Sequence, residues 1–142
     1  MIALDAYALV AFLADEPARE QVEAALGGSC LMSTVNLAES YDVLGRVYGV
    51  SERELRTLVD PLAGEAFAVE LPTAADAWSA ASLRHRYYER ETRALSLADC
   101  FLLATASRLR ASIATTDPAV AAAARGESVE ILALPDSTGR LP

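Results

Sequence analysis

Lysine is absent from this 142-residue chain, so all twelve Lys-or-Arg positions are arginines. A phosphotransfer receiver domain is therefore disfavoured, because its chemistry uses a lysine at the phosphorylation site. Acidic residues number 20 and the net charge is −8. Broad, non-specific coating of nucleic acid draws on a basic face, which this composition does not predict. An acidic pocket remains compatible with phosphate chemistry if bound metal ions reverse the sign of its charge.

Cysteine and long uncharged runs are also scarce. Cys30 and Cys100 lie far apart without a C-x-x-C spacing, which favours two small buried side chains in a reducing cytosol. The longest uncharged run near the start, residues 6–14, is too short to span a bilayer, and no basic segment precedes it. We expect a soluble, cytoplasmic protein without a membrane partner.

Two further classes are disfavoured by missing motifs. A haloacid-dehalogenase-type phosphatase would have an aspartate two residues after Asp5, where this chain has Tyr7. The adjacent glycines Gly27 and Gly28 follow a helical pattern and are expected to end that helix, so they do not form a phosphate-binding loop.

The patterning predicts a single domain, residues 1–142, of the α/β class. We expect strands at residues 2–5, 29–33, 65–71, 111–116 and 128–134. Helices are expected at residues 6–15, 17–26, 34–49, 51–64, 73–90, 96–110 and 117–126. This alternation predicts a mostly parallel sheet covered on both faces, with ligands at the carboxyl ends of its strands.

Two aspartates follow predicted strands. Asp5 ends the first strand and Asp117 ends the fourth, so both would project at the carboxyl edge of the sheet. Each also has a purely structural interpretation as a helix N-cap, and the proline after Asp117 favours that interpretation.

Two more acids lie on the apolar stripes of predicted helices. Asp99 is flanked by Leu95, Leu102 and Leu103 at helical spacing, although Ser96 and Asp99 also fit a capping box. Glu39 interrupts a stripe that contains Val35 and Val43. The sequence therefore assigns Glu39 to the inward side of its helix and Ser40 and Asp42 to the solvent side.

Four carboxylates in one place would repel strongly. A pair about 4 Å apart costs about 4 kcal/mol at an effective dielectric constant of 20. Mg²⁺ or Mn²⁺ removes that cost and prefers oxygen ligands. Such clusters typically serve phosphoester cleavage, in which metal-bound water is the nucleophile and a metal steadies the leaving oxygen.

Four segments, in this order, carry a family resemblance: "IALDAYALVAFLADEP", "VNLAES", "SLADCFLLATA" and "ATTDP". The chain resembles the PIN domain of VapC-type toxins, the ribonuclease halves of VapBC toxin–antitoxin pairs. The family's metal-binding and catalytic acids fall on Asp5, Glu39, Asp99 and Asp117. Tyr7 stands where the family often has a small hydroxyl residue, and Thr115 and Thr116 resemble its polar supports at the edge of the site.

The resemblance implies a three-layer α/β/α fold with a central, mostly parallel five-stranded sheet. It also implies a Mg²⁺-dependent endoribonuclease, with Mn²⁺ as a substitute, that is the toxin of a type II toxin–antitoxin pair. The implied partners are an RNA substrate, a cognate antitoxin and a second copy of the chain, with DNA bound only through the antitoxin. The alternative is a non-catalytic PIN-like module that binds RNA or protein.

The densest basic segment precedes Asp99. It contains Arg84, Arg86, Arg90 and Arg93 beside Tyr87 and Tyr88. Arginines next to aromatic rings suit looped or single-stranded RNA, which offers phosphates and unstacked bases. The alternative is a solvated helix end whose arginines pair with Glu89 and Glu91. His85 is expected at the surface, and Trp78 either in the core or on a dimer surface.

Overall fold

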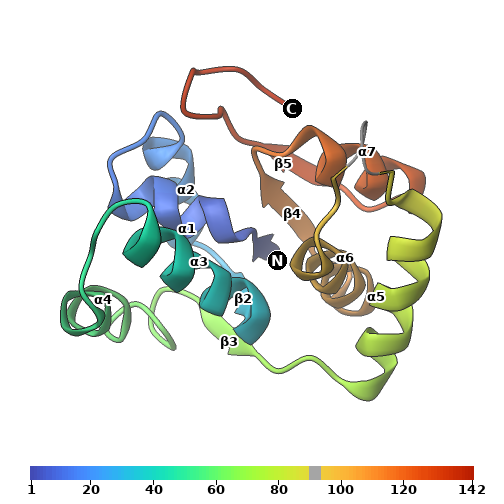
Figure 1. The fold of residues 1–142 in the computed structure, drawn as a ribbon, viewed down its shortest axis with the longest axis horizontal. Coiled ribbons are helices and arrows are strands. Elements are labelled where there is room, and N and C mark those ends of the chain that lie inside the picture. The colour runs from blue at the N-terminus through green and yellow to red at the C-terminus, as the bar shows by residue number, and fades with distance from the viewer. Residues whose placement is uncertain (90–93) are drawn as a thin grey trace.

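The computed structural model describes residues 1–89 and 94–142 (Figure 1). The strands are β1 (Ile2–Leu4), β2 (Cys30–Ser33), β3 (Ala68–Glu70), β4 (Ser112–Thr115) and β5 (Ile131–Ala133). The helices are α1 (Ala6–Leu13), α2 (Arg19–Leu26), α3 (Thr34–Arg46), α4 (Glu52–Val59), α5 (Ala74–Tyr87), α6 (Leu97–Leu109) and α7 (Pro118–Gly126).

Within the described residues the five strands form one sheet in the order β3-β2-β1-β4-β5, and every pairing is parallel. The predicted sheet was mostly parallel, and the observed sheet is wholly so. β1 lies at its centre and pairs with β4 in a register that sets Leu4 opposite Ala114. The carboxyl ends of β1 and β4 are therefore neighbours, as the positions of Asp5 and Asp117 required.

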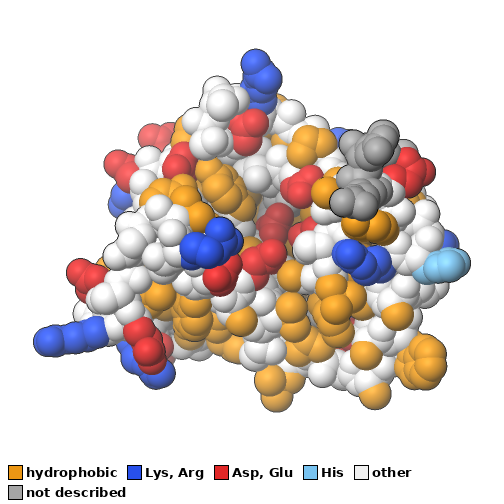
Figure 2. All heavy atoms as spheres, viewed as in Figure 1, with side chains coloured by type: hydrophobic (Ala, Val, Ile, Leu, Met, Phe, Trp, Pro, Cys, Tyr) orange, Lys and Arg blue, Asp and Glu red, His pale blue; other side chains and the backbone are white. Residues whose placement is uncertain are grey.

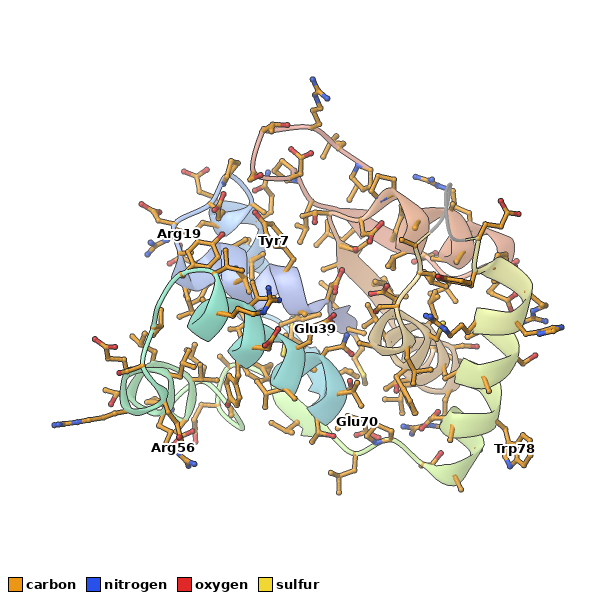
Figure 3. The ribbon with its side chains drawn as sticks, in the orientation of Figure 1. Tyr7, Arg19, Glu39, Arg56, Glu70 and Trp78 are labelled. Atoms are coloured by element: carbon orange, nitrogen blue, oxygen red, sulfur yellow. The ribbon has the colours of Figure 1, made fainter. Side chains whose placement is uncertain are left out.

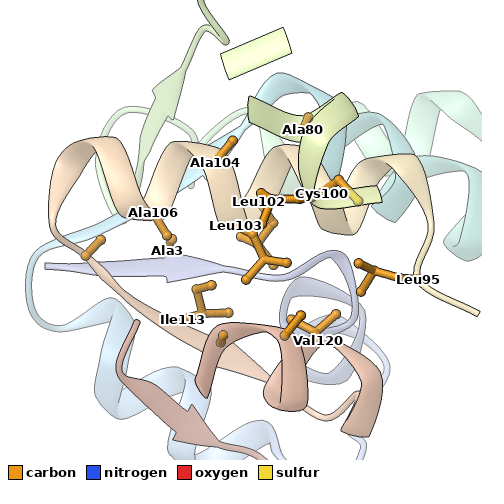
Figure 4. Close-up of a cluster of buried hydrophobic side chains, with 14 of the residues drawn as sticks. Ala3, Ala80, Leu95, Cys100, Leu102, Leu103, Ala104, Ala106, Ile113 and Val120 are labelled. Carbon is orange, nitrogen blue, oxygen red and sulfur yellow. The ribbon is translucent and has the colours of Figure 1, made fainter. Parts of the chain in front are cut away.

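Alternation along the strands directs side chains to two cores. Ala3, Leu31 and Ile113 point to the face covered by α5, α6 and α7, where they join a cluster that includes Leu102 and Val120 (Figure 4).

The residues next to them in each strand point the other way. Leu4, Met32 and Ala114 pack against α1 and α2. A smaller cluster, Val10, Leu44 and Leu55, joins α1 to α3 and α4. The three layers confirm the predicted α/β/α architecture.

Several predicted element ends differ from the structure. The helix predicted for residues 51–64 ends at Val59. Asp60 keeps helical backbone angles, but Pro61 has no N–H to donate to the carbonyl four residues earlier, so the helical hydrogen bonds stop there. The strand predicted for residues 65–71 begins only at Ala68, after a turn in which Gly64 has a φ of 93°. The helix predicted to end at Arg90 ends at Tyr87, because the backbone of Tyr88 is extended. Arg90 itself lies outside the described residues.

Surface and core side chains distribute largely as predicted. Cys30 and Cys100 are buried and unbridged. Trp78 is 81% exposed, which excludes the core interpretation, and its side chain projects from the outer side of α5 (Figure 3). Across residues 1–89 and 94–142, no helix combines the length and apolarity that crossing a membrane requires.

Candidate active site

Asp5 occupies the junction between β1 and α1 and is only 5% exposed. It stands at the N-cap position, but its side chain makes no capping hydrogen bond within the described part of the chain. Instead, Oδ2 accepts a hydrogen bond of 2.6 Å from the hydroxyl of Thr115, the last residue of β4. The neighbouring strand therefore fixes Asp5, and the capping interpretation of Asp5 is wrong.

Asp99 lies in the first turn of α6 and is held by a capping box, as its spacing from Ser96 predicted. The Ser96 N–H donates to Asp99 Oδ2 at 2.6 Å, and the Asp99 N–H donates to Ser96 Oγ at 3.0 Å. The two interpretations of Asp99 are compatible, because capping orients its buried carboxylate toward Asp5 and Glu39.

Glu39 projects from α3 into the space between α3 and α6 (Figure 3). Its Oε2 is buried and has no hydrogen-bond partner among the described residues. The next residue, Ser40, fixes the helix, because its hydroxyl shares one hydrogen between the Ala6 carbonyl at 3.0 Å and the Asn36 carbonyl at 2.8 Å. Ser40 is fully buried, so its assignment to the solvent side is wrong; Asp42 is exposed as predicted.

The structure brings Asp5, Glu39 and Asp99 together: one carboxylate oxygen from each lies within 4.8 Å of the others. Acidic side chains gather in a hollow in the middle of this face of the molecule (Figure 2). These three residues share the hollow, of about 340 Å³, with Tyr7, Thr116 and Asp117.

Burial is the main cause of the electrostatic strain in this group. It raises the pKa of Asp5 to about 7, against the hydrogen bond from Thr115 and with help from the charges of Asp99 and Glu39. Burial also raises the pKa of Glu39 and of Asp99. Each carboxylate is thus less stable in its ionised form here than in water, and a nearby cation would reverse that preference.

Asp117 lies at the edge of this group and is not one of the three converging carboxylates. It caps α7, with Oδ1 accepting from the Ala119 N–H at 2.6 Å, as the Asp-Pro pattern predicted. Its backbone N–H donates to Thr115 Oγ1 at 3.0 Å. Its charge nevertheless raises the pKa of Asp99, so the carboxylate lies close enough to act on the site.

The three predicted supporting residues differ in their surroundings. Thr115 is fully buried and bridges Asp5 and Asp117 through its hydroxyl. Thr116 is half-buried and lines the hollow. Tyr7 also lines it, but its hydroxyl lies near Glu16, whose charge, after burial, raises the pKa of Tyr7. The Tyr7 hydroxyl oxygen is itself buried, beside Glu16 and Ser137.

The predicted RNA-binding arginines fall into two groups. Arg90 and Arg93 lie outside the described residues. Arg86 is 3.0 Å from Glu127 in an ion pair that joins α5 to the end of α7. Arg84 donates to the Leu95 carbonyl, and its positive charge opposes the rise in the pKa of Asp99. Of the arginines that the structure describes in this segment, Arg84 is the one that lies beside the carboxylates.

Ser40 and Ser96 are positioning residues that the sequence analysis did not assign to the site. The capping-box spacing was a usable signal for Ser96. No comparable signal existed for Ser40, because a serine that donates to the carbonyl four residues earlier has no distinctive sequence context.

A model of the PIN domain family matches residues 2–126. A comparison with curated proteins finds no match.

Solved structures with the same fold come from several bacteria. One is VapC20 of Mycobacterium tuberculosis, a sarcin-ricin-loop-cleaving toxin, with 19% identity over 87% of this chain and 95% of that one and a TM-score of 0.69. VapBC2 of Rickettsia felis, bound to a promoter DNA fragment, has 16% identity over 93% and 98% and a TM-score of 0.66. A toxin–antitoxin complex from Klebsiella pneumoniae has 20% identity over 82% and 87% and a TM-score of 0.63.

Proposed function

The chain belongs to the PIN domain family, and from that premise we propose that it is a metal-dependent endoribonuclease, the toxin of a type II toxin–antitoxin pair. The observation that carries the proposal is the convergence of Asp5, Glu39 and Asp99 within one hollow. A structural role does not account for this arrangement, since crowding three mutually repelling carboxylates, two of them on buried residues, destabilises the fold.

The donor set fits a hard divalent cation. Glu39 Oε2 is a buried oxygen that lacks a partner among the described residues, and carboxylate oxygens are the ligands that Mg²⁺ and Mn²⁺ prefer. Asp5, Glu39 and Asp99 would hold the cation, with Asp117 at the rim. When bound, the cation supplies the positive charge that activates water and stabilises the phosphate in the transition state.

The chain's own contribution is orientation. Thr115 directs one oxygen of Asp5, and Ser96 directs one oxygen of Asp99. Ser40 anchors α3 to the start of α1, which sets Glu39 opposite both. Each carboxylate thus comes from a different element. Direct hydrogen bonds hold Asp5 and Asp99, and Glu39 is positioned by the anchored helix that carries it, which limits movement when substrate binds.

The test is RNA cleavage by the purified chain in Mg²⁺ or Mn²⁺, together with mapping of RNA ends after brief induction in cells. A ribonuclease toxin produces new RNA ends and arrests growth. The non-catalytic alternative, a PIN-like module that binds RNA or protein, produces neither. Intact RNA with both metals would contradict the proposal.

Beyond the RNA substrate, one protein partner follows from the proposed toxin role. A cognate antitoxin would occupy the site until it is released, in keeping with the similarity to a toxin–antitoxin complex. Contact with DNA would come only through that antitoxin. A chain with a net charge of −8 does not favour direct DNA binding.

A second copy of the chain is the third proposed partner, through the outer side of α5. Exposed positions between Ala74 and Ser82 carry small uncharged side chains around Trp78, and the acid in this stretch, Asp76, is buried and paired with Arg108. Two acidic chains repel least where neither presents charge, and a protruding tryptophan is a common interface anchor.

We expect Trp78→Ser to raise the dimer dissociation constant by about 30-fold, because an interface tryptophan contributes about 2 kcal/mol or more. Analytical ultracentrifugation measures this constant. Leu58→Ser is the matched control, since Leu58 is a large exposed apolar residue on α4. A wild-type chain that stays monomeric, or equal effects of the two substitutions, would contradict the assignment.

A further inference from the structure

A second hollow lies between the end of α5 and the start of α6. Its volume is about 510 Å³, and it is lined by Ala81, Arg84, His85, Tyr88 and Leu97. Two of these side chains are large, apolar or aromatic, and open to solvent: Tyr88 is 41% exposed and Leu97 is 51% exposed. Side by side in one hollow, they offer a bound group an aromatic and an apolar contact.

Leu97 and Arg84 connect this hollow to the carboxylate site. Leu97 follows Ser96, which lines the acidic hollow and holds Asp99. Arg84 donates to the carbonyl of Leu95 and so ties α5 to the segment that leads into α6. A ligand that spans both hollows would cross from Asp99 to Tyr88 over Ser96 and Leu97.

Arg84 also shapes the surface of this hollow. The centre of its guanidinium group lies 4.3 Å from the centroid of the Tyr88 ring. This cation–π contact orients the tyrosine ring while part of the residue stays exposed. Arg84 therefore covers one face of the Tyr88 ring and sets the orientation of the ring before any ligand binds.

We propose that this hollow is a base subsite, in which an unpaired base of single-stranded RNA stacks on Tyr88 and packs against Leu97 while its backbone runs toward the carboxylates. The proposal rests on the proposed ribonuclease function. Stacking on aromatic rings and arginine planes is the general way in which proteins bind splayed-out bases.

The chemistry of the hollow favours a base over a phosphate or a duplex. The Arg84 guanidinium is already engaged by the Leu95 carbonyl and the Tyr88 ring, so it is a poor free anion site. Ala81 and Leu97 add apolar surface, which suits a base face. Bases inside a duplex are stacked on one another and cannot reach a side-chain ring.

The test compares binding of single-stranded oligouridylate of about ten nucleotides, a length within the range that one binding domain covers. Fluorescence anisotropy is measured in Mg²⁺ in a Glu39→Gln background, so that RNA is not consumed. Tyr88→Ala and Leu97→Ser remove the surface, and Tyr88→Phe retains the ring. Tyr48→Ala is the matched control, because Tyr48 is 40% exposed on the α3 side of the molecule.

We expect Tyr88→Ala to weaken oligouridylate binding by about tenfold, with a smaller loss for Leu97→Ser. Tyr88→Phe and Tyr48→Ala should bind like the parent, and the affinity for an RNA duplex of the same length should not change in any variant. Unfolding temperatures check that each variant is folded.

Two results would overturn the base subsite: single-strand affinity within about twofold of the parent in both Tyr88→Ala and Leu97→Ser, or equal losses for single strand and duplex. The outcome is separable from that of the proposed function. Cleavage by the wild-type chain with no effect of Tyr88→Ala on binding removes the subsite alone. Absence of cleavage in the wild-type chain removes the ribonuclease proposal, whatever the binding shows.

Discussion

We expect the Glu39→Gln variant to cleave RNA on the order of 10³-fold more slowly than the wild-type chain. A cation at a phosphoryl centre contributes several kcal/mol to transition-state stabilisation, and each 1.4 kcal/mol or so is a factor of ten in rate. Glutamine keeps the shape of the side chain and removes its charge. Glu39 is the cleanest position for this test, because Asp99 also caps α6 and Asp5 also binds Thr115.

The variant should fold at least as well as the wild-type chain. Burial raises the pKa of Glu39, so its ionised form destabilises the native state near neutral pH, and glutamine removes that cost. Asp42→Asn is the matched control: it removes one charge from the same helix at an exposed position paired with Arg46. Cleavage by Glu39→Gln at the rate of the Asp42→Asn control would remove Glu39 from the site.

Asp5→Asn is expected to stabilise the metal-free chain in a pH-dependent manner. The pKa of Asp5 is about 7 in the folded protein and 3.8 in a model peptide. The folded state therefore holds this proton more tightly than the unfolded state. The free energy of unfolding falls as the pH rises from 3.8 to about 7. Asparagine cannot ionise, and its side-chain carbonyl can still accept a hydrogen bond from Thr115. The variant therefore lacks the loss of stability that ionisation of Asp5 causes.

Thermal unfolding in a chelator at several pH values measures the effect. At a pH of about 8 we expect the unfolding temperature of Asp5→Asn to exceed that of the wild type by at least about 5 °C. At a pH of about 4 the two should be nearly equal, because Asp5 is then protonated in the folded wild type. A variant that is less stable than the wild type at the higher pH would show that the Asp5 carboxylate is not strained.

The sequence predicted the parallel sheet well because alternating strand and helix patterns are a direct signature of that architecture. The first and fourth apolar runs end at Asp5 and Asp117, which places both side chains at the carboxyl edge of the sheet. Parallel neighbours then bring those ends together. The prediction that Glu39 points inward also follows from periodicity alone, since its side chain interrupts an apolar stripe.

The distinction among the four acids depended on tertiary geometry. Asp117 and Asp99 both carry capping patterns, yet Asp99 joins the converging carboxylates and Asp117 remains at the rim. Helical periodicity places Ser40 at the surface because it carries no information about a hydroxyl that bonds to the backbone of another helix. Arg86 illustrates the same limit, because its partner Glu127 lies 41 positions away in the sequence.

Binding of Mn²⁺ to the purified chain, followed by electron paramagnetic resonance, tests the convergence of Asp5, Glu39 and Asp99 on a cation most directly. Saturable binding is expected in the wild type and in Asp42→Asn. The affinity should fall by at least about tenfold in Glu39→Gln and in Asp5→Asn. Wild-type Mn²⁺ affinity in both of these variants would mean that the buried carboxylates do not form a cation site.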